Sequence, residues 1–232
     1  TPDEVTGKVF DIVIVGTPPA THLAVATAEL RNTPPQLLLI EKPLAQPDAE
    51  AISVFVELAE NSPARVLVGY NQRHKPNTLK FLEVARNPVL GTLTGLRSQM
   101  LESWDGILTA HFWMANEKDS YLAFTDQGGG ALLEHSHALN LFLFFASELG
   151  QGPAVKVEAT VDWVAHESGR YDRESTLSIT LKSGLIGEVK QDLHTWPAIK
   201  EAEATFEHGA LVWTMGGDSD SVTYKNSSGQ IV

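Results

Sequence analysis

The chain has 232 residues, 43% of them hydrophobic, so it can bury a sizeable core and is long enough for two modest domains. Its formal net charge of −12 argues against a surface that binds nucleic acid or an anionic membrane, because phosphate binding needs clustered lysine and arginine. The absence of cysteine excludes disulfides and thiolate metal sites. No apolar run reaches the roughly 18 residues of a membrane span. No signal peptide is visible, and we expect a cytoplasmic protein.

The first third of the chain predicts strands that alternate with helices. Thr21 is placed to cap a helix that runs to about Arg31, and Asp48 opens a second helix that ends before Asn61. Short loops join these helices to apolar, β-branched runs that are typical of buried parallel strands. The three expected strands are residues 10–15, 37–40 and 65–70. This order predicts an α/β, Rossmann-like parallel sheet, present in part, over residues 1–75.

The rest of the chain, residues 76–232, has a different pattern. Many segments alternate between apolar and polar residues and are separated by turn residues, which is typical of antiparallel strands with one solvated face. The expected strands are residues 91–98, 155–164, 176–181, 186–193, 202–206, 210–214 and 222–225. One strong helix is expected over about 131–148, after a shorter one near 77–85. We therefore expect an α+β domain with a large, open, mostly antiparallel sheet.

The tripeptide Glu41-Lys42-Pro43 follows the apolar strand at residues 37–40. In open α/β sheets, ligands bind just beyond the carboxyl ends of the parallel strands. A lysine and a glutamate therefore stand where such a fold carries out its chemistry. A solvated loop charge is the alternative interpretation of Lys42, and two further segments favour the functional one.

The first of these segments is glycine-rich and runs from Gly128 to His137. Its three consecutive glycines permit close approach of the backbone to a ligand or to a neighbouring element. A helix behind them would place Glu134 and His137 on one face, where the carboxylate could orient an imidazole for general acid/base work. A helix start whose polar groups are merely solvated is the alternative. A di-iron site needs the Glu-x-x-His motif twice, and it occurs once, so we expect no metal.

The second segment lies at the end of the third expected strand. Asn71 and Arg73 could donate hydrogen bonds to substrate hydroxyls or to a phosphate, or Arg73 could anchor the loop to the second domain. His22, one turn into the first helix, is either a residue at the cofactor edge or a packing residue.

Several aromatic residues are open to two interpretations. Trp104, Trp113 and Tyr121 lie in a long irregular stretch, and they could contact the apolar face of a sugar or plug the groove between the domains. Trp163, Trp196 and Trp213 would suit a dimer interface on the second sheet, although core packing is the better interpretation of Trp213.

Taken together, the motifs resemble the glucose–fructose oxidoreductase / inositol dehydrogenase / MocA family. The matching segments are residues 11–22 (DIVIVGTPPATH), 40–43 (IEKP), 68–73 (VGYNQR) and 128–137 (GGGALLEHSH). The resemblance implies a Rossmann domain that binds NAD or NADP and an α+β domain that carries the substrate site and often a dimer interface. It also implies hydride transfer between the nicotinamide and a hydroxyl carbon of a sugar, cyclitol or nucleotide sugar.

The resemblance assigns roles to individual residues. Lys42 resembles the family lysine that contacts the reacting hydroxyl, His137 the histidine that takes its proton, and Glu134 the acidic partner. Asn71, Arg73, Trp104 and Tyr121 are the candidate substrate contacts. The residues that match the cofactor side are Thr17, Pro18, His22, Glu41, Lys42 and Pro43. A cis peptide bond before Pro43 would direct the Lys42 side chain inward.

Two departures from the family pattern limit this interpretation. Asn140 stands where an aspartate commonly follows the histidine by three residues. The chain also lacks the G-x-G-x-x-G fingerprint that holds a pyrophosphate at a helix N-terminus. We therefore expect a fragment of a longer oxidoreductase, shortened at its start and at its end near Val232. The rival hypothesis is a sugar-binding or assembly module that has lost catalysis; it predicts weak or no dinucleotide binding and an unstable first domain.

Overall fold

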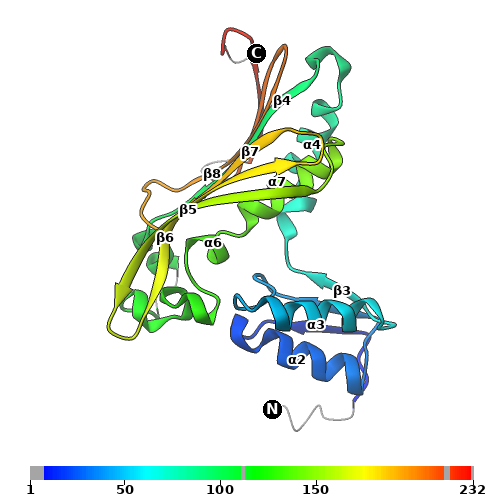
Figure 1. Cartoon of the computed structure of the whole chain (residues 1–232), viewed down its shortest axis with the longest axis vertical. Coiled ribbons are helices and arrows are strands. Elements are labelled where there is room, and N and C mark those ends of the chain that lie inside the picture. The colour runs from blue at the N-terminus through cyan, green and yellow to red at the C-terminus, as the bar shows by residue number, and fades with distance from the viewer. Residues whose placement is uncertain (1–7, 111–112, 217–219, 231–232) are drawn as a thin grey trace.

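The computed structural model describes residues 8–110, 113–216 and 220–230. The expected start at Thr1 and the expected end at Val232 therefore lie outside the described residues. Figure 1 shows a small α/β body at the N-terminal end and a long, twisted sheet that carries helices on one face. The large sheet and the small body approach each other near α6, which lies between them.

The N-terminal body is a parallel sheet with helices on one face. Its elements are β1 (Ile12–Val15), α2 (Pro19–Asn32), β2 (Leu37–Ile40), α3 (Ala49–Glu60) and β3 (Arg65–Val68), with strand order β1-β2-β3. Val15, Leu38 and Ile40 point from the strands into a core closed by Ala26 and Phe55 of the two helices. The intervening strand residues point to the opposite face of the sheet, where Ile12 and Ile14 are exposed. The Rossmann-like sheet is thus confirmed.

The two helix starts differ in their capping. Asp48 caps α3 as predicted, because its carboxylate accepts a hydrogen bond of 2.9 Å from the backbone N–H of Ala51. The predicted cap at Thr21 is wrong. The N-cap of α2 is Pro18, which has no side-chain cap, and Pro19 starts the helix because its fixed φ suits the first turn.

The C-terminal part contains a large sheet of mixed direction. Its strands are β4 (Leu93–Leu101), β5 (Ala154–His166), β6 (Gly169–Leu181), β7 (Ile186–Asp192), β8 (Ile199–Phe206), β9 (Gly209–Thr214) and β10 (Ser221–Asn226). The strand order is β10-β9-β8-β4-β7-β6-β5, and among these strands every pair is antiparallel except β4 with β7. The expected open, mostly antiparallel sheet is confirmed.

Two helices, α4 (Pro76–Ala85) and α7 (His137–Glu148), cover one face of this sheet (Figure 1). Phe81 of α4 packs against Phe145 of α7 with ring centroids 4.3 Å apart. Trp213 is fully buried in the same core, and its Nε1 donates to the hydroxyl of Thr78 at 3.0 Å. Trp213 is therefore a core residue, whereas Trp163 and Trp196 are exposed.

The single helix expected over residues 131–148 is wrong. The structure has two helices, α6 (Ala131–Glu134) and α7, separated at His135 and Ser136. At this junction the N–H groups of Ser136 and Ala138 bond to carbonyls three residues back, not four. The backbone at His135 (φ −93°, ψ 25°) lies outside the α-helical region, so the helix is interrupted between Glu134 and His137.

No helix among the described residues is long and apolar enough to cross a lipid bilayer. The cytoplasmic location and the domain boundary at residue 75 stay predictions.

Replacing Gly187 by alanine should destabilise the C-terminal core. A Cβ at Gly187 would collide with the ring of Phe142 and the carbonyl of Leu96, whereas a Cβ at Gly95 would meet only Thr205 at 3.4 Å. We expect Gly187→Ala to lower the free energy of unfolding by about 1–3 kcal/mol, because the packed core must shift to admit it. Urea unfolding measures this, with Gly95→Ala as the matched control; equal effects of the two variants would contradict the packing described.

Candidate active site

Six of the predicted site residues line one cavity of about 800 Å³. These residues are Thr17, Pro18, Glu41, Lys42, Tyr121 and Glu134. The cavity opens beyond the carboxyl ends of β1 and β2, where Gly16 and Glu41 follow the two strands. Tertiary folding therefore brings residues from the parallel sheet, the irregular stretch and the glycine-rich segment to one place.

The same cavity contains residues that sequence reasoning missed. Met114, Asp119, Ser120 and Gln127 also line it, and they come from the irregular stretch between β4 and α6, as does Trp113, which the sequence had singled out and which lines the cavity too. That stretch folds into α5 (Trp104–Ala110) and the short 3₁₀ turns Glu117–Asp119, Tyr121–Ala123 and Thr125–Gln127. The only signal in the sequence was the unusual length of the segment, which is typical of binding loops but does not say which side chains point inward.

An ion pair between Lys42 and Glu134 joins the two halves of the molecule. The Lys42 ammonium donates to the Glu134 carboxylate at 2.9 Å and to the Glu134 carbonyl at 2.8 Å. Both side chains are only 19% exposed, so solvent screens the pair less than it would a surface pair. The peptide bond between Lys42 and Pro43 is cis, as predicted.

His137 does not line this cavity, and it is not paired with Glu134 as expected. The break between α6 and α7 separates the two positions, and Lys42 takes the carboxylate. Burial, together with the charges of Lys42 and Lys200, lowers the pKa of His137 to about 4. Its Nδ1 has no hydrogen-bond partner among the described residues, and its ring meets that of Tyr70 edge-on at 5.5 Å. At neutral pH this imidazole is uncharged and can accept a proton.

His135 was in the glycine-rich motif but was not predicted as a site residue. It is buried, and burial with the charges of Lys42 and Lys200 lowers its pKa to about 3. The charge of Asp192 and the backbone of Glu102, which follows β4, act in the opposite direction and raise this pKa. No pattern in the sequence pointed to His135, because Glu134 and His137 show the spacing of an acid/base pair and His135 does not.

The three glycines make room for neighbouring protein elements, which was one of the two interpretations. A Cβ on Gly129 would collide with the carbonyls of Tyr121 and Leu122, and one on Gly130 with the Asp172 carboxylate. Asp172 of β6 accepts a hydrogen bond of 2.7 Å from the backbone N–H of Leu132. It thereby takes the place of the missing side-chain cap of α6 and holds the helix that carries Glu134.

His22 is a buried link between two loops of the cofactor side. Its Nδ1 lies 3.0 Å from the carbonyl of Pro43, and its Nε2 lies 2.5 Å from the carbonyl of Thr17. It does not line the cavity described above; it lies behind the residues that do, and ties the loop after β1 to the loop after β2.

Asn71 and Arg73 line a second, neighbouring cavity of about 670 Å³, together with Glu41 and Asn140. The Arg73 Nε donates to the Asn140 side-chain oxygen at 2.7 Å, and its guanidinium lies 5.1 Å from the centre of the Phe144 ring. Arg73 therefore anchors the end of β3 to α7, which was one of its two interpretations. Asn140, the departure from the family pattern, is the acceptor of this contact.

The two predicted aromatic contacts have different surroundings. Tyr121 lines the first cavity, and burial together with the charge of Glu134 raises its pKa to about 12. Trp104 packs in a separate small core, where its Nε1 donates to the hydroxyl of Tyr171 at 3.2 Å. The structure does not bring Trp104 to either cavity.

The family model described as "Oxidoreductase family, NAD-binding Rossmann fold" (GFO_IDH_MocA) matches residues 2–70. The match thus covers less than half of the chain. The match confirms the family that the motifs resemble and ends at Tyr70, before the glycine-rich segment. No curated protein is similar enough in sequence to match the chain.

Solved structures extend the likeness of the fold to the whole chain. An inositol dehydrogenase homolog complexed with NAD⁺ from Azotobacter vinelandii is 15% identical, with a TM-score of 0.78, over 96% of this chain and 56% of that one. A levoglucosan dehydrogenase in complex with NADH and levoglucosan is 20% identical, with a TM-score of 0.73, over 95% and 58%. The UDP-N-acetylglucosamine 3-dehydrogenase GnnA from Acidithiobacillus ferrooxidans is 18% identical, with a TM-score of 0.69, over 100% and 66%. The chain thus spans between 56% and 66% of the length of these proteins.

Replacing Asp172 by asparagine should change how stability depends on pH. Burial raises the pKa of Asp172 from 3.8 to about 6, so between these values the folded protein binds a proton that the unfolded chain releases. The free energy of unfolding should therefore fall as pH rises through this window, by up to about 3 kcal/mol from this one group. Asparagine cannot titrate, so in Asp172→Asn the free energy of unfolding should no longer show this part of its fall with pH. Urea unfolding between pH 4 and pH 7 measures the difference, and parallel curves for the two proteins would contradict it.

Proposed function

We propose that this chain is part of an NAD(P)-dependent oxidoreductase that transfers a hydride between the nicotinamide and a hydroxyl or ketone carbon of a sugar, cyclitol or nucleotide sugar. The observation that carries the proposal is the ion pair of Lys42 and Glu134 at the cavity beyond β1 and β2, with the uncharged imidazole of His137 three residues after Glu134 in the chain. The family match of residues 2–70 supports the cofactor class, and the ligands named with the similar structures support the substrate class.

The residues at the carboxyl ends of β1 and β2 fit the nicotinamide end of such a cofactor. The cavity there is lined by Thr17, Pro18, Glu41 and Lys42, and His22 fixes the loop behind it. NAD or NADP, when bound, supplies the acceptor or donor of the hydride. The sequence printed here has no glycine fingerprint for the pyrophosphate, so these residues would hold only part of the molecule.

The protein's own residues would handle the proton. As the substrate carbon gives up its hydride, the hydroxyl on that carbon loses its proton, and the uncharged His137 ring accepts it. The Lys42 ammonium would stabilise the negative charge that develops on the substrate oxygen, and Glu134 holds that ammonium in place. In the reverse direction His137 returns the proton to the oxygen.

Replacing Lys42 by methionine should lower kcat/KM by about a hundredfold, as the loss of a preorganised charged donor does elsewhere. Replacing His137 by alanine should lower kcat by at least as much, because the proton then has no acceptor.

In the native enzyme, oxidation should slow as pH falls through about 4, where His137 gains its proton. NADH formation at 340 nm on a panel of sugars and cyclitols measures the rates. Lys80→Met, on an exposed lysine, is the control, and equal rates for Lys42→Met and Lys80→Met would refute the role of Lys42.

Titration with NADH and with NADPH tests the cofactor part directly and separates the two dinucleotides. Nicotinamide fluorescence should rise on binding and should report which of the two binds more tightly. If neither binds while sugars do, the rival function of a sugar-binding or assembly module is the better account.

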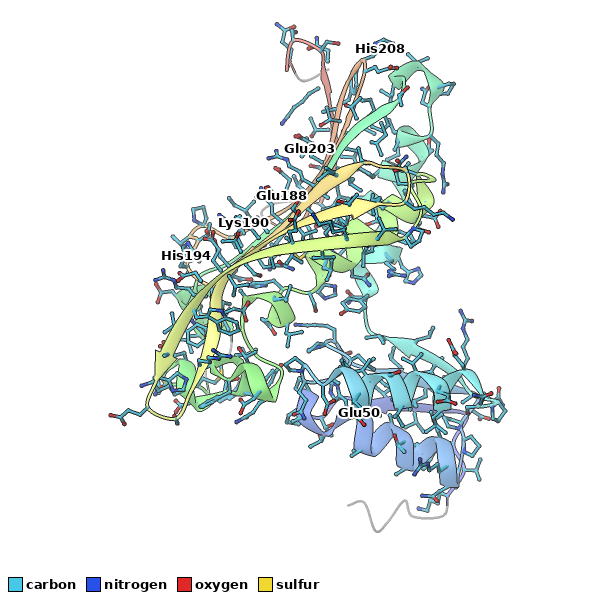
Figure 2. All side chains as sticks on the ribbon, in the orientation of Figure 1. Glu50, Glu188, Lys190, His194, Glu203 and His208 are labelled. Carbon is cyan, nitrogen blue, oxygen red and sulfur yellow. The ribbon has the colours of Figure 1, made fainter. Side chains whose placement is uncertain are left out.

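We also propose that the chain forms a homo-oligomer through the large sheet. Its face opposite α4 and α7 is uncovered and carries acidic and basic side chains from neighbouring strands; Figure 2 shows Glu203, Glu188, Lys190 and His194 spread along it. Arg97 contacts Glu203 at 3.2 Å across this face. Such an ordered polar surface suits pairing with a second copy of itself.

Placing an arginine at Glu188 should weaken this association, because two copies would then bring like charges together. Light scattering after size exclusion should give a dimer mass for the native protein and a lower mass for Glu188→Arg. Glu60→Arg, an exposed change on α3, should leave the mass unchanged. A native monomer, or identical masses for both variants, would refute the interface.

A further inference from the structure

A second partly buried ion pair joins β8 to the end of β4. The ammonium of Lys200, at the start of β8, is 2.9 Å from the carboxylate of Glu102, which follows β4. Their side chains are 27% and 21% exposed, so the pair is half-buried and still accessible. Lys200 and Ala202 are two residues apart on β8, so their side chains point to the same face of the sheet. Ala202 packs in the core beneath α7, and Lys200 therefore points to the helix-covered face.

The pair is close to the proposed reaction centre. The charge of Lys200 contributes to the lowered pKa of both His135 and His137, and the Glu102 backbone acts on His135 in the opposite direction. Neither Lys200 nor Glu102 has a role in the chemistry proposed above.

An exposed aromatic ring stands next to this pair. The Trp196 side chain is 71% exposed. A Cβ built on Gly106 would lie 3.1 Å from the Glu102 carboxylate and 3.5 Å from the Trp196 ring, so both groups border the same small space. Glycine at this position therefore lets α5 pack close to both groups.

Backbone hydrogen bonds hold the ring and the pair together. The N–H of Glu102 bonds to the Asp192 carbonyl, and the N–H of Ser103 bonds to the Thr195 carbonyl at 2.7 Å. The Asp192 carboxylate accepts the Thr195 hydroxyl at 2.5 Å, which fixes the loop before Trp196. The Ser103 hydroxyl is buried and has no hydrogen-bond partner among the described residues.

We propose that Trp196, Glu102 and Lys200 form a subsite that selects an uncharged pyranose-like ring, which rests on the proposed function. The indole packs against the apolar face of the ring, while the ammonium donates to one hydroxyl and the carboxylate accepts from another. Both lysines near the histidines already have a carboxylate partner, so a sugar acid finds no unpaired cation there. The overall charge of −12 also disfavours an anion.

Two matched ligands test the charge preference: methyl β-D-glucopyranoside and methyl β-D-glucuronide, which differ at C6. Ligand-observed NMR titration of the native protein should give a lower Kd for the neutral glycoside. Glu102→Gln frees the Lys200 charge and should shift the ratio of the two Kd values by about fivefold in favour of the glucuronide. Lys200→Gln should shift the ratio in the opposite direction.

Trp196→Ala should weaken the binding of both ligands about tenfold. Trp163→Ala, on an exposed tryptophan that packs against Arg170, is the control and should leave both Kd values unchanged.

Opposite shifts by the two charge variants are the decisive result, since a merely structural ion pair would weaken both ligands equally in either variant. Unchanged ratios, an unchanged affinity in Trp196→Ala, or a native protein that binds neither ligand would overturn the subsite. NADH titration of the same samples keeps this test separate from that of the proposed function. If NADH binds and the glycosides do not, only the subsite fails; if the glycosides bind as expected and NADH does not, only the oxidoreductase function fails.

Discussion

The contact between Lys42 and Glu134 is the interaction on which the candidate active site depends. It joins the loop after β2 to the end of α6 with two hydrogen bonds, one to the carboxylate and one to the carbonyl. Both partners are mostly buried, so removing either one would leave an unpaired charge in a region of low dielectric. The pair therefore holds the small parallel sheet and the large sheet in the relation that creates the cavity.

The position of Glu134 depends in turn on contacts that lie behind it. Gly129 and Gly130 let the segment pass against the turn at Tyr121 and against Asp172, and Asp172 takes over the capping of α6. At the junction after α6, His135 is buried and His137 is partly buried, and both have lowered pKa values that leave them uncharged at neutral pH. A short helix with a tertiary cap can thus place a carboxylate and an imidazole in different directions from only four residues.

Charge balance gives the site its chemical character. Each lysine near the histidines has a carboxylate partner, and the histidines have lowered pKa values because they are buried among cations. An uncharged base between two fixed ion pairs suits a reaction in which a proton and a hydride leave a neutral alcohol. The same balance underlies the proposed preference for an uncharged ring.

The sequence by itself determined the two sheets, the helix at Asp48, the cis bond before Pro43 and the family of the N-terminal part, because these follow from apolar periodicity and short motifs. It also identified Lys42, Glu134, Thr17 and Tyr121, which meet at the cavity. Only the tertiary structure decided that Glu134 pairs with Lys42 instead of His137, that Arg73 anchors α7 through Asn140, and that Trp104 packs against Tyr171. Those contacts join residues 67 to 92 positions apart, and no local pattern specifies which of several chemically suitable partners the fold brings within hydrogen-bonding distance.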